Sequence, residues 1–262
     1  MIHRPVLLAA LLVARSIGAQ TAAPPPDSAL AGITARGRLL AAYDRAAWHG
    51  TDAVLAKLPN PVGVQGFLAE QDRTGNWHVL FGRLSPAADT LYVVARADQT
   101  VGPDSFRVDI PTGQAMGSDS ERVAFRAMRT AGTDLKASPR AWAGTYNSYV
   151  LPRPDGGWLV YFLPAQTQQG VYPHGGDFRY QVSPDGSTVQ SKFQMHQTVL
   201  MLSVPANAVA GMHTVVTADL PQDSDVFLVL SRVPLKPELV RTAHFNFQID
   251  TGGTITWKYA TP

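Results

Sequence analysis

Residues 75–81 of the chain read GNWHVLF, and residues 156–162 read GGWLVYF. Both stretches follow the frame G-x-W-x-V-x-F, in which a glycine-containing turn leads into a strand that opens with tryptophan. Residues 50–52 and 132–134 also match, since both read GTD at nearly the same spacing. Identities are few, but the order of elements around the two copies repeats as well. This pattern predicts a duplicated unit of one helix followed by three strands.

In the first copy, apolar residues between Leu39 and Ala47 recur at helical spacing, and Gly50 is a plausible end of that helix. Strands are expected at residues 64–71, 77–84 and 90–97, with turn residues at 72–75. In the second copy, Ser118 or Ser120 is expected to cap a helix. Strands follow at residues 146–151, 158–163, 178–182 and 188–193, joined by turns at 154–157 and 183–186.

The last third of the chain lacks strong helical signals. Strands are expected at residues 198–204, 213–220, 226–233, 244–250 and 254–259. The continuously apolar run at residues 226–230 suits a central strand covered on both faces. The sequence therefore predicts an α+β fold of predominantly antiparallel β-sheet with two helices, in which a duplicated α-β-β-β unit precedes a C-terminal all-β segment.

The amino terminus has the pattern of a secretory signal. A polar start with Arg4 precedes an apolar run at residues 6–14, and small residues precede a cleavage point after Ala19. The run is too short to span a membrane. We expect a signal peptide at residues 1–19, a Pro-rich tether at 20–28, units at 29–115 and 116–195, and a C-terminal segment at 196–262 packed on the second unit. The expected location is extracytoplasmic, in a periplasm or secreted, with no membrane anchor after cleavage.

Composition excludes several classes of protein. The chain has 262 residues, 16% of them charged, and no cysteine, which excludes disulfide scaffolds, thiolate zinc sites, iron–sulfur clusters and cysteine nucleophiles. The formal net charge is +2, but both Arg4 and Arg15 lie in the expected signal, so the mature chain is balanced. Arginines are scattered without a basic helix or stripe, and no nucleic-acid partner is expected. No cofactor is expected either.

Standard catalytic motifs are absent from the sequence: there is no G-x-S-x-G, H-E-x-x-H, P-loop, strand-linked G-x-G-x-x-G or EF-hand loop. Residues 174–177, HGGD, superficially resemble the His-Gly-Gly-Gly oxyanion motif of lipase-like esterases. The fourth position is Asp177, however, and no nucleophile elbow follows. A loop entering the strand at Phe178, where glycines permit unusual dihedrals, is the favoured interpretation.

Histidines are the main candidates for chemistry. The expected mature chain contains six: His49, His78, His174, His196, His213 and His244. No pair has the i, i+2 or i, i+4 spacing of a local metal site. His196, His213 and His244 lie at or near predicted strand starts. Because they are far apart in the sequence, they can bind one metal ion only if the fold places these strands side by side. His174, Asp177 and His213 are the candidate catalytic residues.

Two further groups carry alternatives. Asp219, Asp223 and Asp225 offer oxygen ligands for calcium, but they lack the glycine and closing glutamate of a calcium loop, and a turn between strands is favoured. Aromatic residues gather in the second copy and are the candidates for an exposed binding surface, with core packing as the alternative. They are Tyr146, Tyr149, Trp158, Tyr161, Tyr172 and Tyr180.

Three functional hypotheses follow. The first is a non-enzymatic exported module that binds an unknown small molecule or protein, favoured by the missing catalytic motifs. Its helix-then-hairpin order is similar to that of small repeated modules in exported bacterial proteins, such as PepSY domains, a likeness that implies no function. The second is an extracytoplasmic hydrolase with a non-standard site near His174, Asp177 and His213. The third is a metal-binding accessory protein that uses histidines.

Overall fold

The computed structural model describes residues 22–205 and 207–260. The expected signal at residues 1–19 and the first two residues of the expected tether lie outside the described residues. Within the described ranges, the chain forms three helices and fifteen mostly antiparallel strands in several sheets, so the predicted α+β fold is confirmed. No helix in these ranges is long and apolar enough to cross a membrane.

The elements follow the predicted order closely in the first two thirds of the chain. The helices are α1 (Asp27–Lys57), α2 (Asp119–Lys136) and α3 (Asp223–Ser231). The first sheet contains β1 (Gly66–Gln71), β2 (Trp77–Leu84), β3 (Leu91–Gln99), β4 (Phe106–Asp109) and β5 (Ala115–Met116). The second contains β6 (Tyr146–Pro152), β7 (Trp158–Pro164), β9 (Phe178–Val182) and β10 (Val189–Gln194). β8 (Val171–His174) pairs with β11 (Leu200–Ser203), and β12 (Gly211–Thr214), β13 (Glu238–Arg241), β14 (Phe245–Ile249) and β15 (Ile255–Tyr259) form the last sheet.

Turn chemistry accounts for the accuracy of the predicted hairpins. In the turn between β1 and β2, Asp72 Oδ1 accepts hydrogen bonds from the backbone N–H groups of Thr74 and Asn76, and Gly75 has a φ of 92°. Gly156 takes the same left-handed conformation between β6 and β7. The two turns place Trp77 and Trp158 as the first residues of their strands. The shared frame in the sequence therefore marks equivalent hairpins, while duplication itself stays a prediction.

The first two sheets are covered by α1 on one face and by α2 on the other. Val79 and Phe81 of β2 pack in a core cluster with Leu40 and Tyr43 of α1, whereas the intervening Leu80 packs in the cluster that contains Phe125 of α2. β7 alternates in the same way between the two clusters. Because successive strand residues point to opposite faces, both faces of each sheet lie in apolar cores.

Helix α1 is longer than predicted in both directions. It begins at Asp27, inside the expected tether of residues 20–28, and it continues through Gly50 to Lys57, so the prediction that Gly50 ends the helix is wrong. A Cβ atom at Gly50 would lie 2.9 Å from Val79 Cγ2. The missing side chain lets the helix approach β2, which explains a glycine in the middle of a helix.

Helix α2 begins as predicted. Ser118 is its N-cap, with its hydroxyl accepting from Glu121 N, while the Glu121 carboxylate accepts from the backbone N–H of Ser118. This reciprocal pair is the capping box that follows from Ser and Glu three residues apart.

The C-terminal segment is not all-β, because residues 223–231, expected to end a turn and enter a strand, form α3. The apolar run at residues 226–230 is compatible with a buried strand or a buried helix, and periodicity alone does not separate them. The capping carboxylate of Asp225 favours the helix. Its carboxylate accepts a hydrogen bond from Gln222 N at 2.7 Å and so satisfies a free N–H at the helix start.

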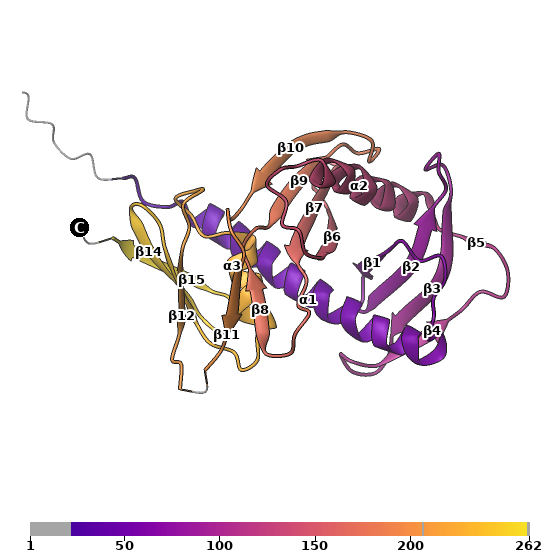
Figure 1. Ribbon diagram of the computed structural model, residues 1–262, viewed down its shortest axis with the longest axis horizontal. Helices are drawn as coiled ribbons and strands as arrows, with labels where there is room; N and C mark the ends of the chain where they lie inside the picture. Colours follow the sequence, from indigo (N-terminus) through magenta and orange to yellow (C-terminus); the bar gives the residue numbers. More distant parts are fainter. Residues whose placement is uncertain (1–21, 206, 261–262) are drawn as a thin grey trace, which may run out of the picture.

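Helix α1 runs from the C-terminal sheet to the first sheet and packs on both (Figure 1). Its first turns, with Leu30 and Ile33, pack with α3 and the sheet β12–β15, and its last turns cover β1–β4. At 31 residues it extends about 46 Å at the usual helical rise. The segment after residue 196 also contacts the second unit through the pairing of β11 with β8. His174, His196 and His213 meet where this segment contacts the second unit.

Candidate metal centre

Three histidines and one aspartate meet where the second unit joins the C-terminal segment. His174 is the last residue of β8, His196 follows β10, His213 lies in β12, and Asp225 lies in the first turn of α3. All four residues are buried, with Asp225 completely enclosed. Residues far apart in the sequence thus form one cluster inside the protein.

The four side chains point their ligand atoms at a common centre. The Nε2 atom of each histidine, at positions 174, 196 and 213, lies 3.1 Å from Asp225 Oδ1. The four atoms lie within 4.8 Å of one another. In a tetrahedral site with metal–ligand bonds of 2.0–2.1 Å, neighbouring ligand atoms are about 3.3 Å apart. The three distances to Asp225 Oδ1 are therefore close to those between ligand atoms of a tetrahedral metal shell.

Two of these nitrogen atoms have no hydrogen-bond partner. Among the described residues, His174 Nε2 and His196 Nε2 are buried side-chain atoms without any such bond, although both lie 3.1 Å from Asp225 Oδ1. A buried polar atom without a partner costs roughly 1–3 kcal/mol. Two of them side by side, aimed at the same point, fit a cation that accepts their lone pairs.

Carboxylates fix the outer nitrogen atoms of two of the rings. Asp177 Oδ1 lies 2.9 Å from both the backbone N and the Nδ1 of His196. Glu238 Oε1 lies 2.9 Å from His213 Nδ1, and its Oε2 accepts from Arg232 at 2.7 Å. When each Nδ1 carries a proton, the lone pair on Nε2 is available to bind a metal ion. Carboxylate–histidine pairs of this kind accompany histidine ligands of metals and orient them.

Helix α3 is held so that Asp225 presents one oxygen to the cluster. Its Oδ2 accepts from Gln222 N, which leaves Oδ1 to face the histidines. Two residues earlier, Asp223 accepts from Arg36 of α1, from Arg179 of β9 at 2.6 Å and from Tyr161 of β7 at 2.8 Å. This second buried carboxylate ties the start of α3 to both α1 and the second sheet.

The HGGD segment acts as a loop, as favoured from the sequence. Gly175 and Gly176 have φ angles of 84° and 62°, a region that side chains rarely adopt. A Cβ atom at Gly175 would lie 2.2 Å from the carbonyl oxygen of Thr198. The tight turn lets His174 and Asp177 approach His196 from two directions.

The charges in the cluster shift its pKa values strongly. Burial lowers the pKa of His196, but the charges of Asp177 and Asp225 outweigh it and raise that pKa well above its ordinary value. For His213 the burial effect is likewise outweighed, by hydrogen bonds to Asp225 and Glu238, and its pKa rises to about 9. Burial lowers the pKa of His174. The histidines outweigh burial at Asp225 and hold its pKa well below the usual range. The cluster therefore favours positive charge strongly.

The structure brings together two of the three histidines proposed for a metal, His196 and His213, and adds His174. His244 is outside the cluster, half exposed, and pairs with Asp219 at the surface. The three candidate catalytic residues His174, Asp177 and His213 do lie in one region, with Asp177 bound to His196 rather than to a nucleophile. Whether these residues bind metal or catalyse a reaction stays a prediction.

The aromatic candidates do not form an exposed surface. Tyr149, Tyr161, Tyr172 and Tyr180 are buried, and only Tyr146 and Trp158 are partly exposed. Core packing is the reason, because the sheets are covered on both faces. The hydroxyls of the buried rings bond inside the protein, as Tyr161 does to Asp223 and Tyr180 to Asp134.

Two residues of the site are not predicted from the sequence. Asp225 is expected there only as part of an acidic turn, and Glu238 is not among the candidates. The available signal for Asp225 was its position three residues after Gln222, just before an apolar run, which is where a capping carboxylate belongs. No local signal marks Glu238, because its role depends on the parallel pairing of β12 with β13.

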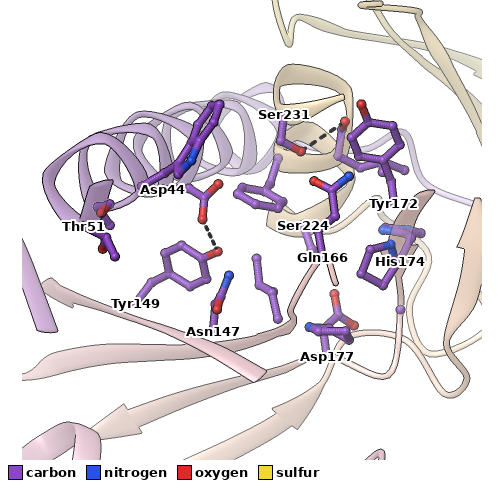
Figure 2. Close-up of a pocket in the computed structure, with 18 of the residues that line it drawn as sticks. Asp44, Thr51, Asn147, Tyr149, Gln166, Tyr172, His174, Asp177, Ser224 and Ser231 are labelled. Atoms are coloured by element: carbon purple, nitrogen blue, oxygen red, sulfur yellow. Dashed lines mark hydrogen bonds between the residues drawn. The ribbon is translucent and has the colours of Figure 1, made fainter. Parts of the chain in front are cut away.

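A pocket lies beside the cluster (Figure 2). Its volume is about 460 Å³, and its walls come from α1, β6, β8, α3 and the loop after β7. His174, Asp177 and Ser224 form the side next to the cluster, and Asp44 and Tyr149 lie opposite. The volume is in the range of small-molecule sites.

Fold and site together describe an α+β protein with a buried His₃Asp candidate metal centre. Comparison of the chain with known protein families, curated proteins and solved structures found no match. The likeness to PepSY domains thus has no family match behind it, and only the geometry of the site bears on function.

Proposed function

We propose that this protein is an exported, non-enzymatic binding protein that holds one divalent transition-metal ion through His174, His196, His213 and Asp225. The observation that carries the proposal is the pair of buried Nε2 atoms that have no hydrogen-bond partner within residues 22–205 and 207–260, each 3.1 Å from the same carboxylate oxygen. The signal-like residues 1–19 support export to the periplasm or the medium.

Zinc fits the donor set best. Three imidazole nitrogens and one carboxylate oxygen are a usual zinc environment, and zinc imposes no geometry of its own. Imidazoles also suit iron, nickel and copper, while the lack of any thiolate removes the sites that depend on cysteine. Mixed nitrogen and oxygen ligands at a buried position therefore favour Zn²⁺.

The ion would serve to fix the fold at the junction. Four protein ligands complete a tetrahedral shell, whereas hydrolytic zinc sites keep one position open for water. The ligands come from β8, the segment after β10, β12 and α3, so one ion would link the second unit to the C-terminal segment. A hydrolase at this place is the alternative, and it would require Asp225 to leave the ion.

The test is metal analysis of protein purified without a histidine tag and without chelators. We expect about one equivalent of metal in the native protein and in His244→Ala, and loss of most of it in His196→Ala. His244 is the matched control because it also pairs with an aspartate, but at the surface. Cobalt substitution would then give the intense visible bands of a tetrahedral site. Absence of stoichiometric binding by native protein, or equal loss in His244→Ala, contradicts the proposal.

A further inference from the structure

The pocket beside the cluster contains a carboxylate that the metal centre does not use. Asp44 of α1 accepts one hydrogen bond, from the hydroxyl of Tyr149 at 2.7 Å. Figure 2 shows its other oxygen turned toward the middle of the pocket. Among the described residues, no lysine, arginine or histidine pairs with Asp44, and burial is what raises its pKa.

The rest of the lining does not supply a balancing charge. Among the residues that the structure describes, no lysine or arginine lines the pocket, and the other carboxylate there, Asp177, is paired with His196. Asp44 is only partly exposed to solvent, and a carboxylate in such a pocket without a cation partner is costly to keep charged. A ligand that brings a positive charge would remove this cost.

The pocket walls suit the apolar part of such a ligand. Phe67, Tyr149 and Phe227 are aromatic, and aromatic faces attract cations. Leu163 and Leu228 add aliphatic surface, and Trp48 stands at the pocket with 61% of its surface exposed.

Neutral acceptors complete the set. Asn147 and Gln166 line the same space. The amide nitrogen of Gln166 donates to Gln168 O, which leaves its oxygen to accept a hydrogen bond. An ammonium group has three N–H donors, and Asp44 and the Gln166 oxygen can accept two of them.

We propose that this pocket binds a small organic ammonium ion with an apolar body, with Asp44 as its counter-ion. The site uses none of the atoms assigned to the metal, so the two proposals stand apart. Loss of metal with retained amine binding would overturn only the metal proposal, and the reverse result would overturn only this one.

The test compares matched probes on the metal-loaded native protein by calorimetry. The probes are 2-phenylethylamine and hexylamine, the uncharged 2-phenylethanol, and the anion phenylacetate. We expect at least one amine to bind, the alcohol to bind about tenfold more weakly or worse, and the anion not to bind. This comparison needs no variant and therefore does not depend on how a variant folds.

A variant pair then assigns the charge to one residue. Asp44→Asn keeps the shape and removes the charge, and amine affinity should fall about tenfold or more. Asp52→Asn, at an exposed position on the same helix, is the matched control and should bind as native protein does. Failure of both amines to bind at 5 mM, an alcohol that binds as well as its amine, or unchanged affinity in a folded Asp44→Asn variant would each overturn the proposal.

Discussion

The most discriminating test of the metal centre changes a residue that does not contact the ion. Asp177 accepts from both the backbone N and Nδ1 of His196, and the surface residue Asp219 accepts from the same two groups of His244. Asp177→Asn and Asp219→Asn therefore remove the same charge from the same kind of pair. Only the first pair belongs to the cluster.

The magnitude follows from what Asp177 does. Its charge makes His196 a better electron donor and holds the ring so that Nε2 faces Asp225. An asparagine oxygen still accepts one of the two hydrogen bonds, but the charge is gone. Loss of such a carboxylate usually lowers metal affinity 10–100-fold, about 1.4–2.8 kcal/mol. Apo-protein stability should fall by about 1–2 kcal/mol, because a charge-assisted buried hydrogen bond is lost.

The assay is competition for Zn²⁺ against a chromophoric chelator at pH 7.5, with circular dichroism to show that each variant is folded. We expect the zinc dissociation constant of Asp177→Asn to rise at least tenfold and that of Asp219→Asn to stay within twofold of native. If Asp177→Asn is folded and binds zinc as tightly as native protein does, or if both variants weaken equally, the reasoning is refuted.

Three further outcomes follow. Chelation should lower the free energy of unfolding by roughly 3–4 kcal/mol relative to protein at a free zinc concentration several hundred times its dissociation constant, measured by urea denaturation; an unchanged midpoint would contradict a stabilising ion. Gly37→Ala should destabilise the protein by roughly 1–3 kcal/mol in the same assay, because the added Cβ would lie 2.4 Å from Val226 Cβ. Gly32→Ala is the matched control: its Cβ would approach only the end of a flexible arginine, so the free energy of unfolding should rise by about 0.5–1 kcal/mol. The pKa of His78 is raised, chiefly by its hydrogen bond to Asp98, so native protein should be more stable than His78→Gln below the ordinary histidine pKa and should lose this advantage as the pH rises through the raised value. Because 43% of the His78 side chain is exposed, the difference in unfolding free energy should stay below about 1 kcal/mol. A difference that widens as the pH rises would refute the assignment.

The hairpins and the start of α2 could be predicted because they depend on residues close together in the sequence. Turns at residues 72–75 and 154–157 depend on their own aspartates and glycines, so the hairpins around them could be located within one or two residues. The cap of α2 at Ser118 was also local. Features that depend on distant partners were missed. Gly50 reads as a helix end unless Val79 is known to pack against it, and the run at residues 226–230 reads as a strand unless the capping role of Asp225 is seen.

The candidate site was only half predictable for the same reason. Its histidines could be named as candidates, but nothing in their spacing separates His174 from His244. What separates them is the pairing of β8 with β11 and of β12 with β13, which carries His174 and His213 to the start of α3. His244 starts a different hairpin, and its neighbour there is Asp219 at the surface.

Charge balance gives an independent reason to expect a divalent ion. The buried carboxylates of Asp177, Asp225 and Glu238 face one buried guanidinium, that of Arg232, while Asp223 has two arginines of its own. With neutral imidazoles, the cluster therefore has an excess of two negative charges. Buried charges are costly unless they are compensated. One divalent cation at the centre of the four ligand atoms cancels the excess and also gives a partner to the two buried Nε2 atoms that lack one. Without an ion, protonation of His196 and His213, whose pKa values are raised, would have to supply the same two positive charges, so the cluster is arranged to hold positive charge at this point.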